Sequence, residues 1–268
     1  MFKNLFFIIL INTSIVAQTT INPAQITTIA AKQRMYTERL AKAKFAKNYF
    51  IDVENSNRQI NIGIILFDEN LKMLTNYVAN DEYKQKIDKI ISLWKDYQEQ
   101  IKSEDASSIN KIYKSNTELL DNCNDVIKIL NAYFKSKGSN EKSDFELQVA
   151  DYSATSGRLR YLSQRAALYY IYAFKNIGKP TVELKNTIDL FDTTVSSLLT
   201  CQFNTGEIDE NLSKIFTEWN SIKSQAVAKD GTISITEKSI APEVMIANCD
   251  KILVLAEKLT SQYIGLLK

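Results

Sequence analysis

The residues in this sequence that are best suited to binding chemistry are arginines that occur in two similar segments. The first segment carries Arg34 and Arg39, and the second carries Arg160 and Arg165. Both arginines recur after 126 positions, from 34 to 160 and from 39 to 165. A planar guanidinium group donates forked hydrogen bonds to oxyanions. The repeated pair therefore indicates an element that binds a small anion.

Composition excludes several other kinds of chemistry. The chain has no histidine, which removes Ser-His-Asp and Cys-His catalysis and the commonest transition-metal ligand. Its three cysteines, Cys123, Cys201 and Cys249, have no close spacing and predict no metal cluster. No clustered pair of carboxylates suggests catalysis. We therefore expect no enzyme, no cofactor and no metal, and the net charge of +2 does not indicate nucleic-acid binding.

The first residues have the pattern of a secretory signal. Lys3 supplies a positive charge, residues 5–10 are apolar, and small residues lead to Ala17 and Gln18. We expect residues 1–18 to be removed and the mature chain to be periplasmic or secreted. No later stretch approaches the roughly 18 apolar residues that cross a bilayer, so we expect no transmembrane span in the mature chain.

The rest of the chain has the spacing of amphipathic helices. Only seven glycines and three prolines occur among 268 residues, which favours long helices over many short strands. Asn22 is the expected cap of a helix with Pro23 in its first turn, Asp81 is expected to cap another, and Gly138 to end a third. The expected helices cover about 23–55, 56–78, from 81 onward, from 105 or 107 to 137, 143–177, 181–203, 209–228, and from 234–237 to the end.

Further landmarks repeat in the same order at nearly the same offset. They are Phe67-Asp68 with Phe191-Asp192, Trp94 with Trp219, and Asn122-Cys123 with Asn248-Cys249. A repeat of this length indicates a duplicated domain, and four amphipathic helices with short connections are typical of a bundle. The predicted fold is all-α, with two tandem antiparallel four-helix bundles over 19–138 and 139–268. The aromatic pairs are expected in the core. For Cys123 and Cys249, buried thiols and a disulfide both remain open.

The duplication predicts where the arginines lie. If the first helices of the two bundles pack together, equivalent positions face one another and Arg34 and Arg160 converge. Two partly buried guanidinium groups repel each other unless an anion lies between them. Glu38 is expected to pair with Arg34 along the helix, whereas Gln164 leaves Arg160 without such a partner. The alternative is that both arginines lie on solvated faces with their stems on apolar neighbours.

The two segments resemble a known family. Residues 156–165 (Ser-Gly-Arg-Leu-Arg-Tyr-Leu-Ser-Gln-Arg) are similar to the first-helix signature of the PilJ-type domain, the N-terminal sensor module of type IV pilus methyl-accepting chemotaxis transducers. Residues 31–42 are similar to the same pattern, and NarX-like nitrate/nitrite sensor domains carry a comparable segment. The resemblance implies a nitrate-like anion held between first helices by arginines that fall on Arg34 and Arg160. It also implies a backbone contact near Gly157, where the first copy has Ala31.

The resemblance and the repeat together predict an exported ligand-binding or sensor protein. It would hold nitrate or nitrite between the first helices of its two bundles, with Arg39 and Arg165 beside the central pair. Such a chain has no second membrane span and no cytoplasmic module, so a membrane receptor or envelope protein would carry the signal. The alternative is a helical protein–protein interaction module of the cell envelope that binds no small molecule.

Overall fold

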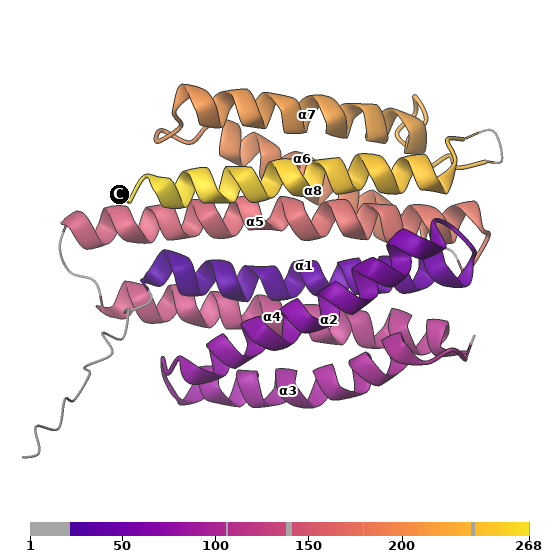
Figure 1. The fold of residues 1–268 in the computed structure, drawn as a ribbon. Coiled ribbons are helices and arrows are strands. Elements are labelled where there is room, and N and C mark those ends of the chain that lie inside the picture. Colours follow the sequence, from indigo (N-terminus) through magenta and orange to yellow (C-terminus); the bar gives the residue numbers. More distant parts are fainter. Residues whose placement is uncertain (1–21, 106, 138–140, 179, 237–238, 268) are drawn as a thin grey trace, which may run out of the picture.

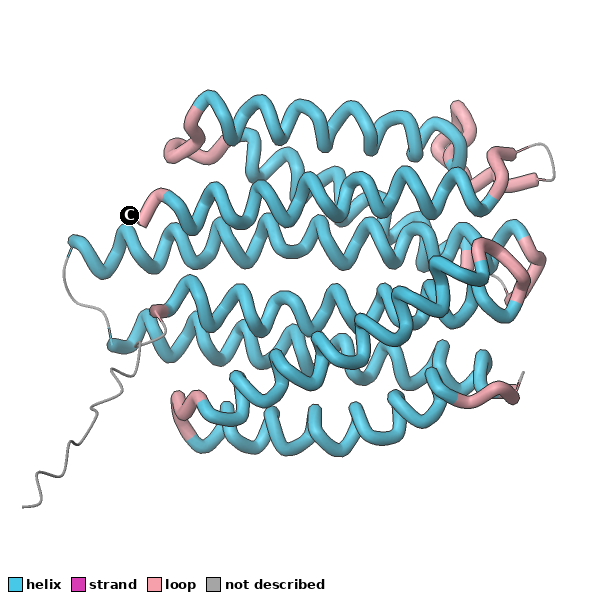
Figure 2. Tube along the Cα trace, in the orientation of Figure 1, coloured by secondary structure: helices cyan, strands magenta, loops and turns pink. Residues whose placement is uncertain are grey.

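The chain folds into helices. The computed structural model describes residues 22–105, 107–137, 141–178, 180–236 and 239–267, and these residues form eight helices and no strand (Figures 1 and 2). The prediction of an all-helical chain is confirmed. The expected signal at 1–18, Gly138 and the boundary between 138 and 139 lie outside the described residues. The helices are α1 (Pro23–Asn48), α2 (Val53–Asn76), α3 (Asp81–Lys102), α4 (Ser108–Lys137), α5 (Glu141–Phe174), α6 (Thr181–Leu199), α7 (Gly206–Ala226) and α8 (Pro242–Gly265).

Two helix starts test the predicted caps. Asn22 accepts a hydrogen bond from the Gln25 backbone at 2.8 Å, and the Gln25 side chain accepts one from the Asn22 backbone at 3.0 Å. This reciprocal capping confirms the predicted start of α1. Asp81 was wrong as the cap of α3, because Asn80 takes this role and accepts from the Tyr83 backbone at 2.8 Å.

The first helix ends earlier than the prediction of 55. It ends at Asn48 because the chain enters the left-handed region at Phe50, with φ of 58°. The Ile51 amide then donates back to the Ala46 carbonyl at 2.8 Å, which closes a Schellman-type turn without glycine. Ile51 remains buried, so the apolar pattern of the sequence continues through this turn. The helical period of apolar residues therefore does not mark the end of α1.

The start of the last helix was also predicted wrongly. It begins at Pro242 and not within 234–237. Proline fits the first turn of a helix, where its missing N–H leaves no hydrogen bond unmade. The residues before it are held differently, since Val227 bridges Ile233 and the Ser234 amide donates to the Ala226 carbonyl at 2.9 Å. The remaining predicted helices exist, with ends that differ by a few residues.

Helices α1 and α5 form the centre of the molecule. Figure 1 shows them side by side, with α3 and α7 at opposite outer edges. Helix α1 packs along α2, α4 and α5, whereas α5 packs along α6, α8 and α1. Helix α3 rests on α4, and α7 rests on α8. Among the described residues, no helix is long and apolar enough to span a membrane.

The predicted aromatic landmarks lie in the core. The rings of Phe67 and Trp94 stack with centroids 3.8 Å apart, and the Trp94 indole donates to the Asp68 carboxylate at 2.6 Å. In the second half the rings of Phe191 and Trp219 stack with centroids 3.7 Å apart, and the Trp219 indole donates to the Asp192 carboxylate at 2.7 Å. All four rings are buried, which confirms their assignment to the core.

The cysteines are core residues. Cys123, Cys201 and Cys249 are all buried and free, so Cys123 and Cys249 form no disulfide in this structure. Burial raises the pKa of the Cys123 and Cys249 thiols to about 12, which keeps both protonated and unreactive at neutral pH.

Candidate functional site

The interface between α1 and α5 pairs equivalent positions of the two helices. Near its start, the Thr28 hydroxyl lies 2.9 Å from the Ser153 hydroxyl. Near its end, the rings of Phe45 and Tyr172 have centroids 3.8 Å apart. Residues later in α1 contact residues later in α5, so the two helices run parallel. The residues of α1 that face α5 therefore lie opposite residues about 126 positions later in the chain.

The two helices approach each other closely at a pair of small residues, Ala31 and Gly157. A Cβ atom on Gly157 would lie 3.3 Å from the Ala31 Cβ. It would also lie 2.8 Å from Nη2 of Arg160 and 3.6 Å from Nη2 of Arg34. Both guanidinium groups thus reach the space that the missing Gly157 side chain leaves open. The pairing of equivalent helix positions predicts this convergence of Arg34 and Arg160.

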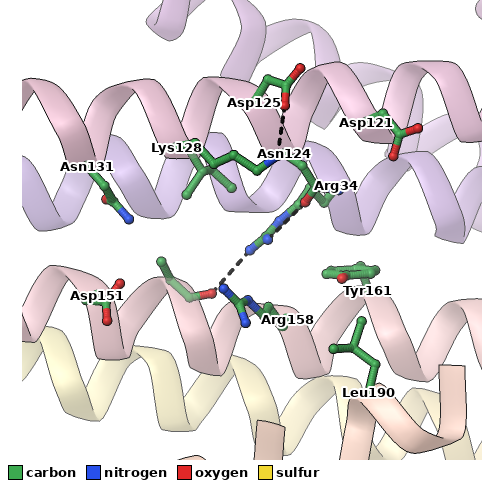
Figure 3. Close-up of a pocket in the computed structure, with 12 residues that line it drawn as sticks. Arg34, Asp121, Asn124, Asp125, Lys128, Asn131, Asp151, Arg158, Tyr161 and Leu190 are labelled. Atoms are coloured by element: carbon green, nitrogen blue, oxygen red, sulfur yellow. Dashed lines mark hydrogen bonds and ion pairs between the residues drawn. The ribbon is translucent and has the colours of Figure 1, made fainter. Parts of the chain in front are cut away.

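Arg34 reaches across from α1 to α4 and α5. Its side chain is 3% exposed, and its terminal nitrogens donate to Asn124 Oδ1 and to the Ala154 carbonyl, each at 3.2 Å. Its guanidinium carbon lies 5.0 Å from the centroid of the Tyr161 ring, a distance that permits a cation–π contact. Figure 3 shows the group between α4 and α5, with Tyr161 and Arg158 on the opposite wall. Its Nε has no hydrogen-bond partner in the described part of the chain.

Arg160 is buried more deeply and holds fewer partners. It is 1% exposed, and its Nε and Nη2 are buried without a hydrogen-bond partner among the described residues. Burial lowers the pKa of Arg160 to about 10, although the negative charge of Glu257 acts to raise it. Burial also lowers the pKa of Arg34 to about 10. Both groups therefore stay charged at neutral pH. Their burial shows that the alternative of solvated faces was wrong for this pair.

The expected pair between Arg34 and Glu38 does not form. Glu38 instead faces α5, where its Oε1 lies 3.8 Å from Nε of Arg165. Arg165 donates from Nε and Nη2 to the Tyr169 hydroxyl at 3.1 and 3.0 Å. Glu38 is fully buried and neither of its oxygens has a hydrogen-bond partner among the described residues. Burial raises the pKa of Glu38 to about 7, although Arg165 opposes the rise.

The second arginine of each segment lies away from Gly157. Five residues separate it from the first, which is about 7.5 Å along a helix. Arg39 donates to Gln59 on α2 at 3.4 Å and not to the α1–α5 interface. Arg165 is occupied by Glu38 and Tyr169. Of the five predicted site residues, the structure thus brings together Arg34, Arg160 and Gly157, whereas Arg39 and Arg165 belong to neighbouring polar contacts.

A polar cluster beside the arginines was missed from the sequence. The buried Lys42 ammonium on α1 lies 2.5 Å from Asp250 on α8, and Gln59 donates to the same carboxylate at 3.0 Å. Asn124, which binds Arg34, occupies the position on α4 that Asp250 occupies on α8, with the same offset of 126 (124 to 250). Both residues directly follow the repeated Asn-Cys pair, and this adjacency was the available signal.

The chemistry that this arrangement offers is hydrogen-bond donation. The two converging groups are hydrogen-bond donors, and among the described residues that surround them no base is paired with a nucleophile. Comparison with models of protein families, with curated proteins and with solved structures finds no match to this chain. The residues and their geometry therefore carry the functional conclusion.

Proposed function

We propose that this protein is an exported ligand-binding or sensor protein that holds a small planar oxyanion, such as nitrate, between Arg34 and Arg160. The observation that carries the proposal is Arg160, a buried guanidinium group whose Nε and Nη2 have no hydrogen-bond partner among the residues that the structure describes. It shares the space at Gly157 with a second buried guanidinium group. The sequence resemblance to PilJ-type and NarX-like sensor domains supports the same assignment.

We also infer that the chain consists of two tandem four-helix bundles that arose by duplication. The turns after α1 and α5 support this, because Phe50 and Asn176 have φ of 58° and 53° at positions 126 apart. The Ile51 amide donates five residues back at 2.8 Å, and the Ile177 amide donates five residues back at 2.9 Å. The repeated Phe-Trp-Asp clusters support it equally. In this proposal one chain supplies both halves of a site that the NarX-like sensor domains, which it resembles, form between two subunits.

The energetics favour an anion at this position. Two like charges that are removed from water carry an effective cost of several kcal/mol for each ion unless a partner compensates them. A hydrogen bond to a charged group is worth about 1.5–3 kcal/mol. Arg160 and Arg34 both have buried N–H groups that bond to no acceptor within the described residues. A planar oxyanion accepts several such bonds at once and cancels one of the two charges.

Isothermal titration calorimetry tests the proposal directly. The purified chain is titrated with nitrate and nitrite, with chloride and sulfate as anions of other shapes. We expect saturable binding of the planar anions with a stoichiometry of one. Arg160→Gln and Arg34→Gln each remove one charged donor set and should weaken binding at least tenfold, which corresponds to about 1.4 kcal/mol.

Arg58→Gln is the matched control. Arg58 is exposed on α2 and bonds only to Asn55 among the described residues, so this change should leave anion binding unaltered. Thermal unfolding of each variant separates lost binding from lost folding. If the wild-type protein binds none of these anions, the proposal of an anion site is refuted. That result would favour the second candidate, an envelope interaction module, for which Phe50 at 87% exposure is the clearest contact residue.

A further inference from the structure

A cavity of about 330 Å³ opens between α4 and α5, with Arg34 of α1 at its inner wall. We propose that it is a second ligand site that binds an α-amino acid with an apolar side chain. Arg34 also takes part in the proposed anion site at Gly157, whereas Arg160 does not line this cavity, so Arg160 is the residue that distinguishes the two sites. The residues that the inference uses are Arg34, Arg158, Asp151, Asn131, Tyr161 and Leu190.

Two guanidinium groups that face the cavity have N–H groups not engaged in hydrogen bonds with described residues. Arg34 uses one hydrogen bond from each terminal nitrogen, which leaves three of the five N–H groups of an arginine unengaged. Arg158 on α5 is exposed and makes no hydrogen bond or ion pair with any described residue. Figure 3 shows the two groups close together in the middle of the cavity. They form a receptor for one carboxylate.

The balance of charge around the cavity favours a zwitterion over a simple anion. Three cationic and three acidic side chains line it, so the lining is neutral overall. Lys128 and Asp125 pair with each other at 3.0 Å, whereas Asp121 and Asp151 make no ion pair within the described part of the chain. A phosphate or a dicarboxylate would meet unpaired carboxylates here. A ligand with its own ammonium group would be paired at both ends.

Asp151 and the two arginines line the same cavity, where they can pair with the ammonium and the carboxylate of one ligand. Arg34 donates to the Ala154 carbonyl, and Asp151 lies just under one helical turn before it, a rise of about 4.5 Å. Both polar groups therefore lie along the same stretch of α5. Figure 3 shows Asp151 and Asn131 facing each other at one end, with Tyr161 and Leu190 at the other. The ammonium would lie at Asp151, and the side chain would lie against Tyr161 and Leu190.

Calorimetry with matched probes tests each part of this site. The probes are L-leucine, 4-methylpentanoate without the ammonium, 3-methylbutylamine without the carboxylate, and inorganic phosphate. We expect L-leucine to bind and each other probe to bind at least tenfold more weakly. Equal binding of 4-methylpentanoate would overturn the ammonium position. Stronger binding of phosphate, or no binding of L-leucine, would overturn the proposal.

Variants then locate the site. Arg158→Gln and Asp151→Asn should each weaken L-leucine binding at least tenfold, and both residues are exposed, so folding should be retained. Asp144→Asn is the matched control, since Asp144 is an exposed acid of the same helix that does not line the cavity. Equal losses in Asp144→Asn and Asp151→Asn would overturn the assignment. Arg160→Gln should leave L-leucine binding unchanged, which separates this site from the anion site.

Discussion

Glu38 is the most informative single residue for a test of the α1–α5 interface. Its carboxyl group is fully buried between the two helices, with Arg165 at 3.8 Å and no hydrogen bond to either oxygen among the described residues. The second half of the chain carries Gln164 at the equivalent position, buried and uncharged. The substitution Glu38→Gln therefore converts the first half to the chemistry of the second.

The expected magnitude follows from the pKa. Burial raises the pKa of Glu38 from the usual 4.5 to about 7. Between these values the folded protein holds a proton that the unfolded chain releases, so stability falls as pH rises through this window. One pKa unit corresponds to about 1.4 kcal/mol, and the full loss is on the order of 3 kcal/mol between pH 4.5 and pH 7. Glu38→Gln removes this dependence.

Urea unfolding measured at pH values from 4.5 to 8.5 gives the comparison. We expect the stability of Glu38→Gln relative to the wild type to increase with pH over this range. Glu69→Gln is the control, because Glu69 is exposed on α2. Differences between variants cancel the titration of all other groups. Parallel curves for Glu38→Gln and the wild type would refute the burial of a carboxylate at this interface.

Three further substitutions have defined outcomes. Gly157→Ala places a methyl group 2.8 Å from Nη2 of Arg160, so nitrate affinity measured by calorimetry should fall at least tenfold. The free energy of unfolding should change by no more than about 1 kcal/mol, which is the helix preference of alanine over glycine. Unchanged nitrate affinity would place the anion elsewhere. Phe50→Gly relieves a left-handed aromatic residue and should raise stability by about 1 kcal/mol in urea, whereas destabilisation would contradict the turn geometry. Asp250→Ala leaves the buried Lys42 without its carboxylate and should lower the melting temperature, with a loss of about 3–5 kcal/mol; a neutral result would show that Lys42 reaches water.

The helical fold and the convergence of the two arginines follow from local patterns in the sequence. Capping residues, turn residues and apolar spacing together recovered all eight helices of the described residues, and the repeat offset placed Arg34 opposite Arg160. Helix ends were harder where capping departed from the common residues. Phe50 ends α1 in a conformation that usually belongs to glycine, and Ile51 stays buried, so the apolar period does not mark the turn.

The polar contacts across the central interface could not be derived from one helix alone. Glu38 lies four residues after Arg34, a spacing that favours a pair along the helix. It instead faces Arg165, because both positions point into the α1–α5 interface. Lys42 and Asp250 lie on α1 and α8, and only the packing of those helices on α5 brings them together. Local spacing thus predicts faces of helices, whereas partners depend on which faces meet.

The most direct test of the central claim is a crystal structure of the mature protein grown with saturating nitrate. The proposed function predicts planar density between the guanidinium groups of Arg34 and Arg160, within hydrogen-bonding distance of both and beside Gly157. Guanidinium groups that turn apart, or that enclose only water at saturating nitrate, would contradict it.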